Sequence, residues 1–358
     1  SSKMKKIILI FLIYFLQFLN LRSIEPKLEE IIKNLNNPWS LSFLTRDDIL
    51  ITEKSGSLLK INLINKKINK FTHNLNILED GQGGLLEVLF KNNEIYVSYS
   101  ENRGGGKSST SVAKALIKNS NLNFKNIFRA EPPINSGYHF GSRLVIKDNH
   151  LFITAGERGK GMIAQDAQKH PGSIIRINLD GSIPNNNPKF ENKKNWLPEI
   201  YQIGVRNPQG MALSPFNGEI YLTNHGAKGG DWFGIAKKAE NYGWKILGWG
   251  GTNYTGTKIG PKWKPGFTKA IKYWVPSIAA SSMIIYKGKE FQEWNGDALI
   301  TSLKDQSLRK IKFKNNNFIK EDIIFKEIIG RIRDIEIQKT TGEIFLLTDQ
   351  GSVWRLYK

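Results

Sequence analysis

The sequence predicts an all-β fold, a six-bladed β-propeller of four-stranded antiparallel blades, and three observations indicate it. A short run rich in β-branched and aromatic residues recurs along the chain as DILITE, EIYVSY, HLFITA, EIYLTN, DALITS and EIFLLT. Each copy ends in a small or charged turn, as a buried strand does. Further apolar runs flank most copies, and self-similarity at this period is typical of propellers and solenoids.

The strands of one repeat can be assigned in order. An apolar run such as LSFL from Leu41 comes first, and the recurring run is the second strand. A third run follows, as in GSIIRIN from Gly172, and a fourth lies between repeats, as in EIYQIG from Glu199. The last repeat reaches Lys358 without a fourth strand. We therefore expect residues 28–35, ahead of the first repeat, to complete the last blade and close the ring.

Composition restricts the function. The formal net charge is +20, but the lysines are scattered among Asn and Ile rather than gathered in a stripe, so we expect no nucleic-acid partner. The absence of cysteine excludes disulfides, thiolate catalysis and cysteine metal sites.

The N-terminus has the pattern of an export signal. Lys5 and Lys6 precede an apolar stretch over residues 7–18, which is short for a membrane span. We expect residues 1–23 to be a signal peptide or N-terminal anchor, residues 24–358 to form the propeller domain, and the protein to be periplasmic. Membrane attachment is expected only if the N-terminal segment stays uncleaved.

Blade geometry predicts where the chemistry lies. In an antiparallel blade the first strand begins where the second ends, so two segments per blade converge on one mouth of the ring. Repeats three and four also carry long insertions, which in such folds often carry function. The predicted mouth collects His139, His225, Arg206, Arg331, Arg333, Lys304 and Glu157.

Four permanent cations around a channel repel each other unless an anion lies among them. We expect a planar polyanionic ligand held by arginine forks. The alternative is that the arginines are solvated rim residues paired with Asp334, Asp349 or Glu157. His139 lies in GYHFGSRL, where glycines allow close approach of a ligand, and Glu157 of the same blade would hold its ring as a general base.

Several motifs resemble the pyrroloquinoline quinone (PQQ) dependent glucose and sorbosone dehydrogenases, most closely their periplasmic aldose sugar dehydrogenase branch. The motifs are GQGGLLEV from Gly81, HFGSRL from His139, VRNPQGMA from Val205, NHGAKGGD from Asn224, NYGW from Asn241 and RIRD from Arg331. The resemblance runs in order from about Pro38 to Leu356. It implies a six-bladed propeller with PQQ, a planar tricarboxylate quinone, over the central channel.

The resemblance also implies roles for individual residues. Arg206 and Asn207 would bind near the quinone carbonyls, Lys304, Arg331 and Arg333 would hold the carboxylates, and Gln82 would add a polar contact. Backbone carbonyls of Gly226 and Ala227 would bind calcium, an ion that suits oxygen ligands. The implied reaction is hydride transfer from the anomeric carbon of an aldose to the quinone, giving a lactone, with His139 as base, Glu157 as its partner, and Arg206 and calcium stabilising charge.

Ala227 and Glu157 depart from the family pattern. Ala227 stands where the family usually has proline, and Glu157 stands where it usually has aspartate. We expect these departures to affect calcium affinity and sugar specificity.

Two alternative functions stay open: a binding propeller that has lost the chemistry, and a calcium-dependent lactonase-type hydrolase on the same fold. The sequence names neither the sugar nor the electron acceptor, for which a cytochrome or a quinone are the candidates. Trp244, Trp249 and Trp263 in the fourth-repeat insertion are interpreted as packing residues, with sugar stacking by Trp249 or Tyr254 as a further hypothesis.

Overall fold

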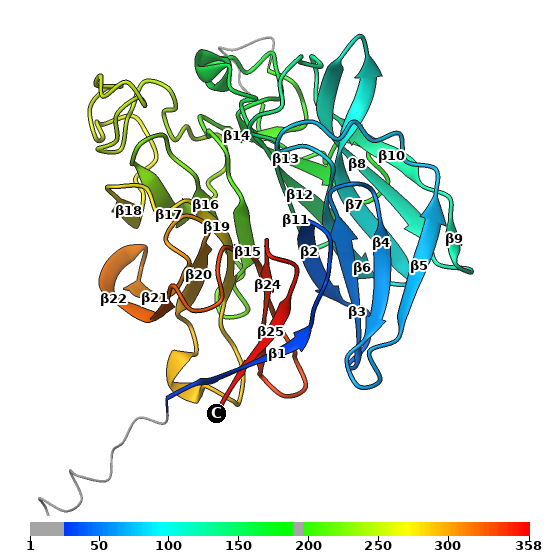
Figure 1. Cartoon of the computed structure of the whole chain (residues 1–358). Coiled ribbons are helices and arrows are strands. Elements are labelled where there is room, and N and C mark those ends of the chain that lie inside the picture. Colours follow the sequence, from blue (N-terminus) through cyan, green and yellow to red (C-terminus); the bar gives the residue numbers. More distant parts are fainter. Residues whose placement is uncertain (1–24, 190–195) are drawn as a thin grey trace, which may run out of the picture.

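The computed structural model describes residues 25–189 and 196–358, and in this part of the chain six antiparallel sheets form the blades of a β-propeller (Figure 1). The predicted fold class is confirmed. The signal peptide or anchor predicted over residues 1–23 lies outside the described residues. Within the described part, no helix combines the length and apolarity needed to span a membrane.

The blades are built mainly from strands that follow one another along the chain, with β1 and β9 as the exceptions. The first contains β2 (Pro38–Phe43), β3 (Asp48–Glu53), β4 (Leu58–Asn62) and β5 (Ile68–His73), to which β9 (Asn121–Leu122) adds in parallel. The second contains β6 (Leu85–Lys91), β7 (Glu94–Gly104), β8 (Lys107–Leu116) and β10 (Lys125–Arg129). The third contains β11 (Gly141–Lys147), β12 (His150–Ala155), β13 (Ser173–Asn178) and β14 (Ile200–Ile203).

The remaining blades follow the same order. The fourth contains β15 (Gly210–Leu213), β16 (Ile220–Asn224), β17 (Asp231–Ile235) and β18 (Lys272–Trp274). The fifth contains β19 (Ala280–Ile285), β20 (Ala298–Ser302), β21 (Ser307–Lys314) and β22 (Asn317–Lys326). The sixth contains β23 (Ile332–Ile337), β24 (Ile344–Thr348), β25 (Val353–Tyr357) and β1 (Lys27–Ile32). Two 3₁₀ turns, η1 (Gly161–Gln165) and η2 (Gln292–Trp294), lie in loops.

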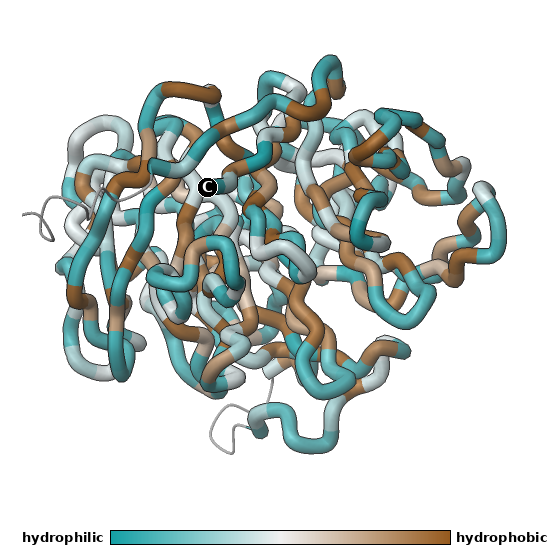
Figure 2. The backbone as a smooth tube through the Cα atoms, turned by 90° about the horizontal axis from the view of Figure 1, so that it is seen from below, coloured by the Kyte–Doolittle hydropathy of each residue, from teal (hydrophilic) through white to brown (hydrophobic). Residues whose placement is uncertain are grey.

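The core consists of apolar clusters between neighbouring blades. Leu144 of the third blade packs with Tyr96 of the second, and Ile335 of the sixth packs with Leu299 of the fifth. Every other neighbouring pair is joined in the same way, because alternate residues of a twisted strand face each adjacent sheet. In the view from below, the loops at the margin are mostly hydrophilic (Figure 2).

The ring closes through pairing of the two chain ends. β1 lies antiparallel to β25, with Lys27 opposite Tyr357 (Figure 1). Ile32 is buried in the cluster between the sixth and first blades. The expected completion of the last blade by an N-terminal strand is thus present, and it covers the edge of β25 that would otherwise be free to pair with another chain.

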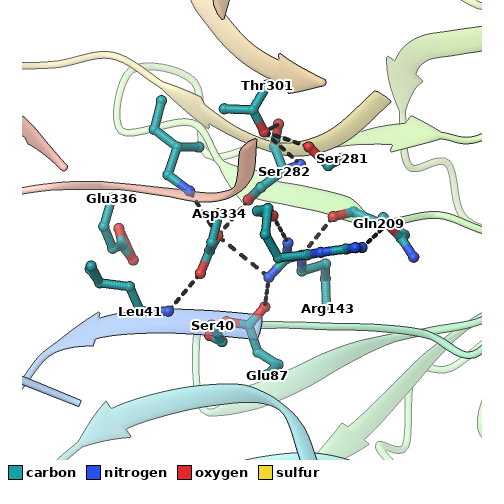
Figure 3. Close-up of polar contacts among 12 residues, drawn as sticks. Ser40, Leu41, Glu87, Arg143, Gln209, Ser281, Ser282, Thr301, Asp334 and Glu336 are labelled. Atoms are coloured by element: carbon teal, nitrogen blue, oxygen red, sulfur yellow. Dashed lines mark hydrogen bonds and ion pairs between the residues drawn. The ribbon is translucent and has the colours of Figure 1, made fainter. Parts of the chain in front are cut away.

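A buried guanidinium connects the inner strands across the channel (Figure 3). Arg143 on β11 donates to the backbone carbonyls of Gln209 and Arg333, each at 2.6 Å. Its Nη1 lies 3.1 Å from a Glu87 carboxylate oxygen of β6 and 3.4 Å from one of Asp334 on β23. Arg143 therefore joins the second, third and sixth blades to the segment that enters the fourth.

Asp334 extends this network to the other two blades. Its carboxylate accepts the Leu41 backbone N–H of β2 at 2.8 Å and the Ser282 hydroxyl of β19 at 2.7 Å. Ser40 of β2 donates to Glu87 at 2.7 Å. The network of Arg143, Glu87 and Asp334 thus includes or contacts the inner strands of five blades, and it reaches the fourth blade through Gln209, the residue before β15.

The far end of the channel contains a cavity of about 1040 Å³ lined by the later halves of the inner strands. Glu336 faces this cavity beside Asp334 and Glu87 (Figure 3). Burial, followed by the Asp334 and Glu87 charges, raises the pKa of Glu336 to about 8. Burial also raises the pKa of Glu87 to about 7, although Arg143 opposes the effect. The cavity lies away from the mouth residues predicted above, which precede the inner strands.

Removal of β1 is expected to destabilise the ring. A chain that starts at residue 34 loses the pairing with β25 and the burial of Ile32, and exposes a sheet edge. We expect a melting temperature lower by several degrees and association at high concentration, measured by calorimetry and light scattering against a chain that starts at residue 25. Equal melting temperatures would show that β1 does not stabilise the closure.

Glu336→Gln is expected to flatten the dependence of stability on pH. The folded-state pKa of Glu336 is raised to about 8, so the folded protein favours the protonated side chain. The resulting contribution to stability is present at a pH below the unfolded-state pKa and is lost as the pH rises through 8. At pH 9 the free energy of unfolding of the variant should therefore exceed that of the parent by on the order of 1–3 kcal/mol, and at pH 4 the two should be equal. Urea titrations at both pH values check this, with the exposed Glu25→Gln as the control.

Candidate active site

Loops before the inner strands and after the second strands gather polar residues at one end of the ring, called the mouth here. It comprises Lys54, Gln82, His139, Glu157, Arg206, Asn207, His225, Arg331, Arg333 and Asp349. Contacts join these residues across blades: the Glu157 N–H donates to the Arg206 carbonyl at 2.8 Å, and the Gln82 side chain accepts the His139 N–H at 2.9 Å. The convergence arises because every blade presents the same two turns to the same end.

His139 and Glu157 form a buried pair. His139 Nδ1 contacts Glu157 Oε1, and the carboxylate is only 2% exposed. The Glu157 oxygens also accept the N–H groups of Gly159 at 2.5 Å and Gly161 at 2.6 Å, and the Trp244 indole N–H at 3.2 Å. The carboxylate therefore has a full set of donors, which fixes the imidazole ring with Nε2 on the side away from Glu157.

The backbone of His139 is held in a conformation that few residues adopt. Its φ is +52°, in the left-handed region. Gly156 allows this approach, because a Cβ there would lie 1.9 Å from the His139 carbonyl oxygen. Arg158 fixes the preceding segment by donating to the Tyr138 carbonyl at 3.0 Å and stacking 3.8 Å above the Phe140 ring. Strained residues of this kind gather at functional sites.

The protonation states suit a base. Burial lowers the pKa of His139, the hydrogen bond to Glu157 opposes this, and the Arg206 charge adds to the lowering, so that the net direction is downward. Burial alone raises the pKa of Glu157, but the His139 and Trp244 hydrogen bonds and the Arg206 charge bring it below its usual value. At neutral pH the pair is a neutral imidazole beside a carboxylate, and Nε2 is free to accept a proton.

Arg206 and Asn207 are oriented by Asn224 at the end of β16. The Asn224 side-chain oxygen accepts both of their backbone N–H groups, at 3.0 and 3.1 Å. The Arg206 guanidinium donates to the His225 carbonyl at 3.0 Å. The Asn207 side-chain oxygen accepts the Gly141 N–H at 3.0 Å, which leaves its NH₂ group as the part of the amide with further donors.

Arg331 and Arg333 share one carboxylate. Arg333 makes two hydrogen bonds to Asp349, at 2.8 and 2.9 Å, and Arg331 makes one at 3.1 Å. The pairing with Asp349 considered in the sequence analysis as an alternative is therefore present. However, a single carboxylate cannot neutralise two guanidinium groups, and Lys54 adds a third cation whose pKa is lowered by burial and by the Arg333 charge. The group has a surplus of positive charge, which favours an anion.

Lys304 is exposed in the loop after β20, and it has no hydrogen bond or ion pair among the described residues. It is the predicted cofactor residue that the structure does not connect to the others. Gln82, predicted to contact the cofactor, has its oxygen engaged by the His139 N–H and retains its NH₂ group as a donor.

Gly226 and Ala227 lie in a buried turn folded around Asp231. One Asp231 oxygen accepts the Gly226 N–H at 2.9 Å and the Ser277 hydroxyl at 2.8 Å, and the other accepts the Ala280 N–H at 2.9 Å. The carbonyls of Gly226 and Ala227 accept no hydrogen bond from the described residues, although both residues are buried. Unpaired buried carbonyls fit a hard cation such as calcium.

His225 of this turn lies near both an anion, Asp231, and a cation, Arg206. Burial and the Arg206 charge lower the pKa of His225 to about 4 against the opposing effect of Asp231. Among residues 25–189 and 196–358, no group of three or more His, Cys, Asp or Glu side chains is placed to hold a metal. The acidic donor set that the lactonase-type alternative requires is not found in that part of the chain.

Sequence reasoning gave no role to several residues of the site, although the rule for strand ends places them at the mouth. Lys54 was available from the rule that placed residues after the second strands at the mouth. The roles of Asn224 and Arg158, which bind backbone groups, left no sequence signal, because any polar side chain in a turn has the same appearance. Trp244 was interpreted as packing, and it also donates to Glu157. Trp249 is buried against Tyr242 and Trp232, which agrees with packing rather than sugar stacking.

Comparison with known proteins gives a consistent result. The glucose/sorbosone dehydrogenase family model matches residues 35–357. The chain is 33% identical to the aldose sugar dehydrogenase YliI of Escherichia coli, covering 90% of each chain. It is 26% identical to quinoprotein glucose dehydrogenase B of Acinetobacter calcoaceticus, over 93% of this chain and 87% of the relative. The soluble aldose sugar dehydrogenase of Escherichia coli, solved in its apo form, superimposes with a TM-score of 0.86 at 32% identity, covering 93% of this chain and 99% of the other. The chain therefore belongs to the glucose/sorbosone dehydrogenase family.

Proposed function

We propose that this protein oxidises aldose sugars at the anomeric carbon to lactones with PQQ as cofactor and calcium as its metal ion. The observation that carries the proposal is the buried His139–Glu157 pair beside a surplus of cations at the mouth. The sugar dehydrogenase membership shown by the comparisons supports the reaction class.

The donor set fits PQQ. Arg333 and Lys54 would bind its carboxylates together with Arg331, and Arg206 and the Asn207 amide would lie near the quinone carbonyls. These groups supply charge-assisted donors in the forked geometry that carboxylates prefer. When bound, PQQ would supply the hydride acceptor, and calcium on the Gly226 and Ala227 carbonyls would favour negative charge nearby. Lys304 would contribute only by long-range attraction from its exposed position.

His139 would remove the proton from the anomeric hydroxyl through Nε2. Its lowered pKa keeps the ring neutral at neutral pH, and Glu157 stabilises the imidazolium as it forms. Arg206, whose guanidinium is fixed by the His225 carbonyl, provides preorganised positive charge for an oxygen that becomes negative. The side chains therefore hold the sugar hydroxyl, move its proton and stabilise charge.

Export to the periplasm by the N-terminal segment, cleaved or retained as an anchor, is part of the proposal, and the electron acceptor would be a cytochrome or a quinone. A binding propeller that lacks chemistry is the outcome if PQQ binds without turnover. Hydrolysis of a lactone without PQQ would instead favour the lactonase-type alternative.

His139→Gln is expected to lower kcat about 10²- to 10⁴-fold while PQQ binding is retained, because the variant loses the base and keeps the cationic residues. The parent should remain active below pH 6.5, since the pKa of His139 is lowered. Dye reduction with a panel of aldoses, PQQ and calcium measures this, with His150→Gln at the opposite end of the blade as control. Unchanged turnover in His139→Gln would remove His139 as the base.

Arg333→Met is expected to weaken PQQ binding about tenfold or more, and Arg331→Met less than about threefold. Arg333 is the more buried, at 14% exposure of its side chain against 45% for Arg331, so its charge is less screened. Absorbance titration of the apo-protein with PQQ and calcium measures both affinities. Arg355→Met, a paired arginine on β25 outside the mouth, is the control. Equal losses from both variants would contradict the burial argument.

A further inference from the structure

The Trp244 indole touches three separate parts of the candidate site. Its Nε1 lies 3.2 Å from Glu157 Oε2, and its ring centroid lies 5.5 Å from the Arg206 guanidinium carbon. The ring also packs in a buried cluster with Ala164 and Ala227, and the residue is only 7% exposed. Trp244 thus lies where the proposed base pair, the proposed quinone arginine and the proposed calcium turn meet.

The Glu157 carboxylate depends on Trp244 for its hydrogen bond to another blade, although the Glu157 backbone N–H also donates to the Arg206 carbonyl. Two of its donors, the N–H groups of Gly159 and Gly161, lie two and four residues away in the same loop and would move with it. His139 is the group that the carboxylate orients. Trp244 comes from the fourth-blade insertion, so its hydrogen bond is the side-chain contact that fixes the carboxylate against a different part of the ring.

Trp244 is itself held firmly. The Trp244 backbone N–H donates to the Gly204 carbonyl at 3.0 Å, and the Trp244 backbone carbonyl accepts the Gln165 side-chain amide at 2.6 Å. Gln165 and Asn241 exchange two amide hydrogen bonds, at 2.7 and 3.1 Å. Only glycine fits at position 204, because a Cβ there would lie 2.0 Å from the Asn241 side-chain oxygen. An indole held at its backbone on both sides can position other groups.

We infer that Trp244 is a positioning residue for the dehydrogenase reaction: its indole N–H holds the Glu157 carboxylate and limits the negative charge that this carboxylate presents to His139, and its ring supports Arg206 and the Ala227 turn. The inference rests on the proposed function for its role in catalysis. The contact with Glu157 can be tested without cofactor or sugar.

Trp244→Phe keeps an aromatic ring and removes the N–H. With one donor fewer, the Glu157 carboxylate presents more negative charge to His139 and stabilises the imidazolium. We expect the pKa of the His139 ring in the full-length apo-protein to rise by about 0.5 to 1. The other charged or titratable groups that act on this ring are Arg206, Arg158 and His225; the substitution replaces none of them, and the phenyl ring keeps an aromatic face beside Arg206. Titration by NMR of the histidine Cε1–H signals measures the shift, with the His139 signal identified by its loss in His139→Gln.

Trp249→Phe is the matched control. Trp249 lies in the same insertion, is equally buried and also donates through Nε1 at 3.2 Å, but to the Tyr242 carbonyl rather than to Glu157. It should lower stability without moving the pKa of His139. An unchanged pKa in Trp244→Phe, or an equal shift in Trp249→Phe, would overturn the inference.

Gln165→Leu decides the matter if Trp244→Phe does not fold. It removes the hydrogen bond that holds the Trp244 carbonyl but keeps every donor to Glu157. Because the indole N–H is then held less firmly, a smaller rise of the same sign is expected, and no rise would count against the inference. In active enzyme, the acid limb of kcat should move to higher pH in parallel. Failure of the parent to bind PQQ would overturn the proposed function, while the NMR titration would still report on the Trp244–Glu157 contact.

Discussion

The Arg143 guanidinium in the central channel is the interaction on which the rest of the structure depends. Through Glu87, Asp334 and two backbone carbonyls it joins inner strands from blades far apart in the sequence. An unpaired charge at this depth is costly, so the network is stable only when all of its partners are in place. It is therefore expected to fix the position of the inner strands relative to one another, and with them the turns from which the mouth is built.

The mouth inherits its precision from these strands. His139 lies two residues before the start of β11, Asn207 lies three residues before the start of β15, and Arg333 lies inside β23. The Arg333 carbonyl accepts from Arg143 while its side chain binds Asp349 at the mouth. The same residue thus belongs to the channel network by its backbone and to the candidate site by its side chain.

Electrostatic asymmetry separates the two ends of the channel. Glu87, Asp334 and Glu336 gather toward the far cavity, where burial and mutual repulsion raise the pKa values of Glu87 and Glu336. At the mouth, the Arg206 and Arg333 charges instead lower the pKa values of neighbouring groups, namely His139, His225 and Lys54. A planar anion is consequently favoured at the mouth and disfavoured at the other end, and Arg143 lies between the two regions.

The sequence by itself determined the number of blades, their strand order and the closure by an N-terminal strand, because each repeat carries its own short run of β-branched and aromatic residues bounded by turns. It also placed His139, Glu157, Arg206 and Arg333 at one end, because a rule about strand direction needs no coordinates. Only the tertiary structure decided that Asp349 is shared by two arginines, that Asn224 holds the backbone of Arg206, that Lys304 stands apart, and that Trp244 reaches Glu157. Those contacts join residues from different blades or loops, and their distances depend on how the sheets pack around the channel, which no local pattern encodes.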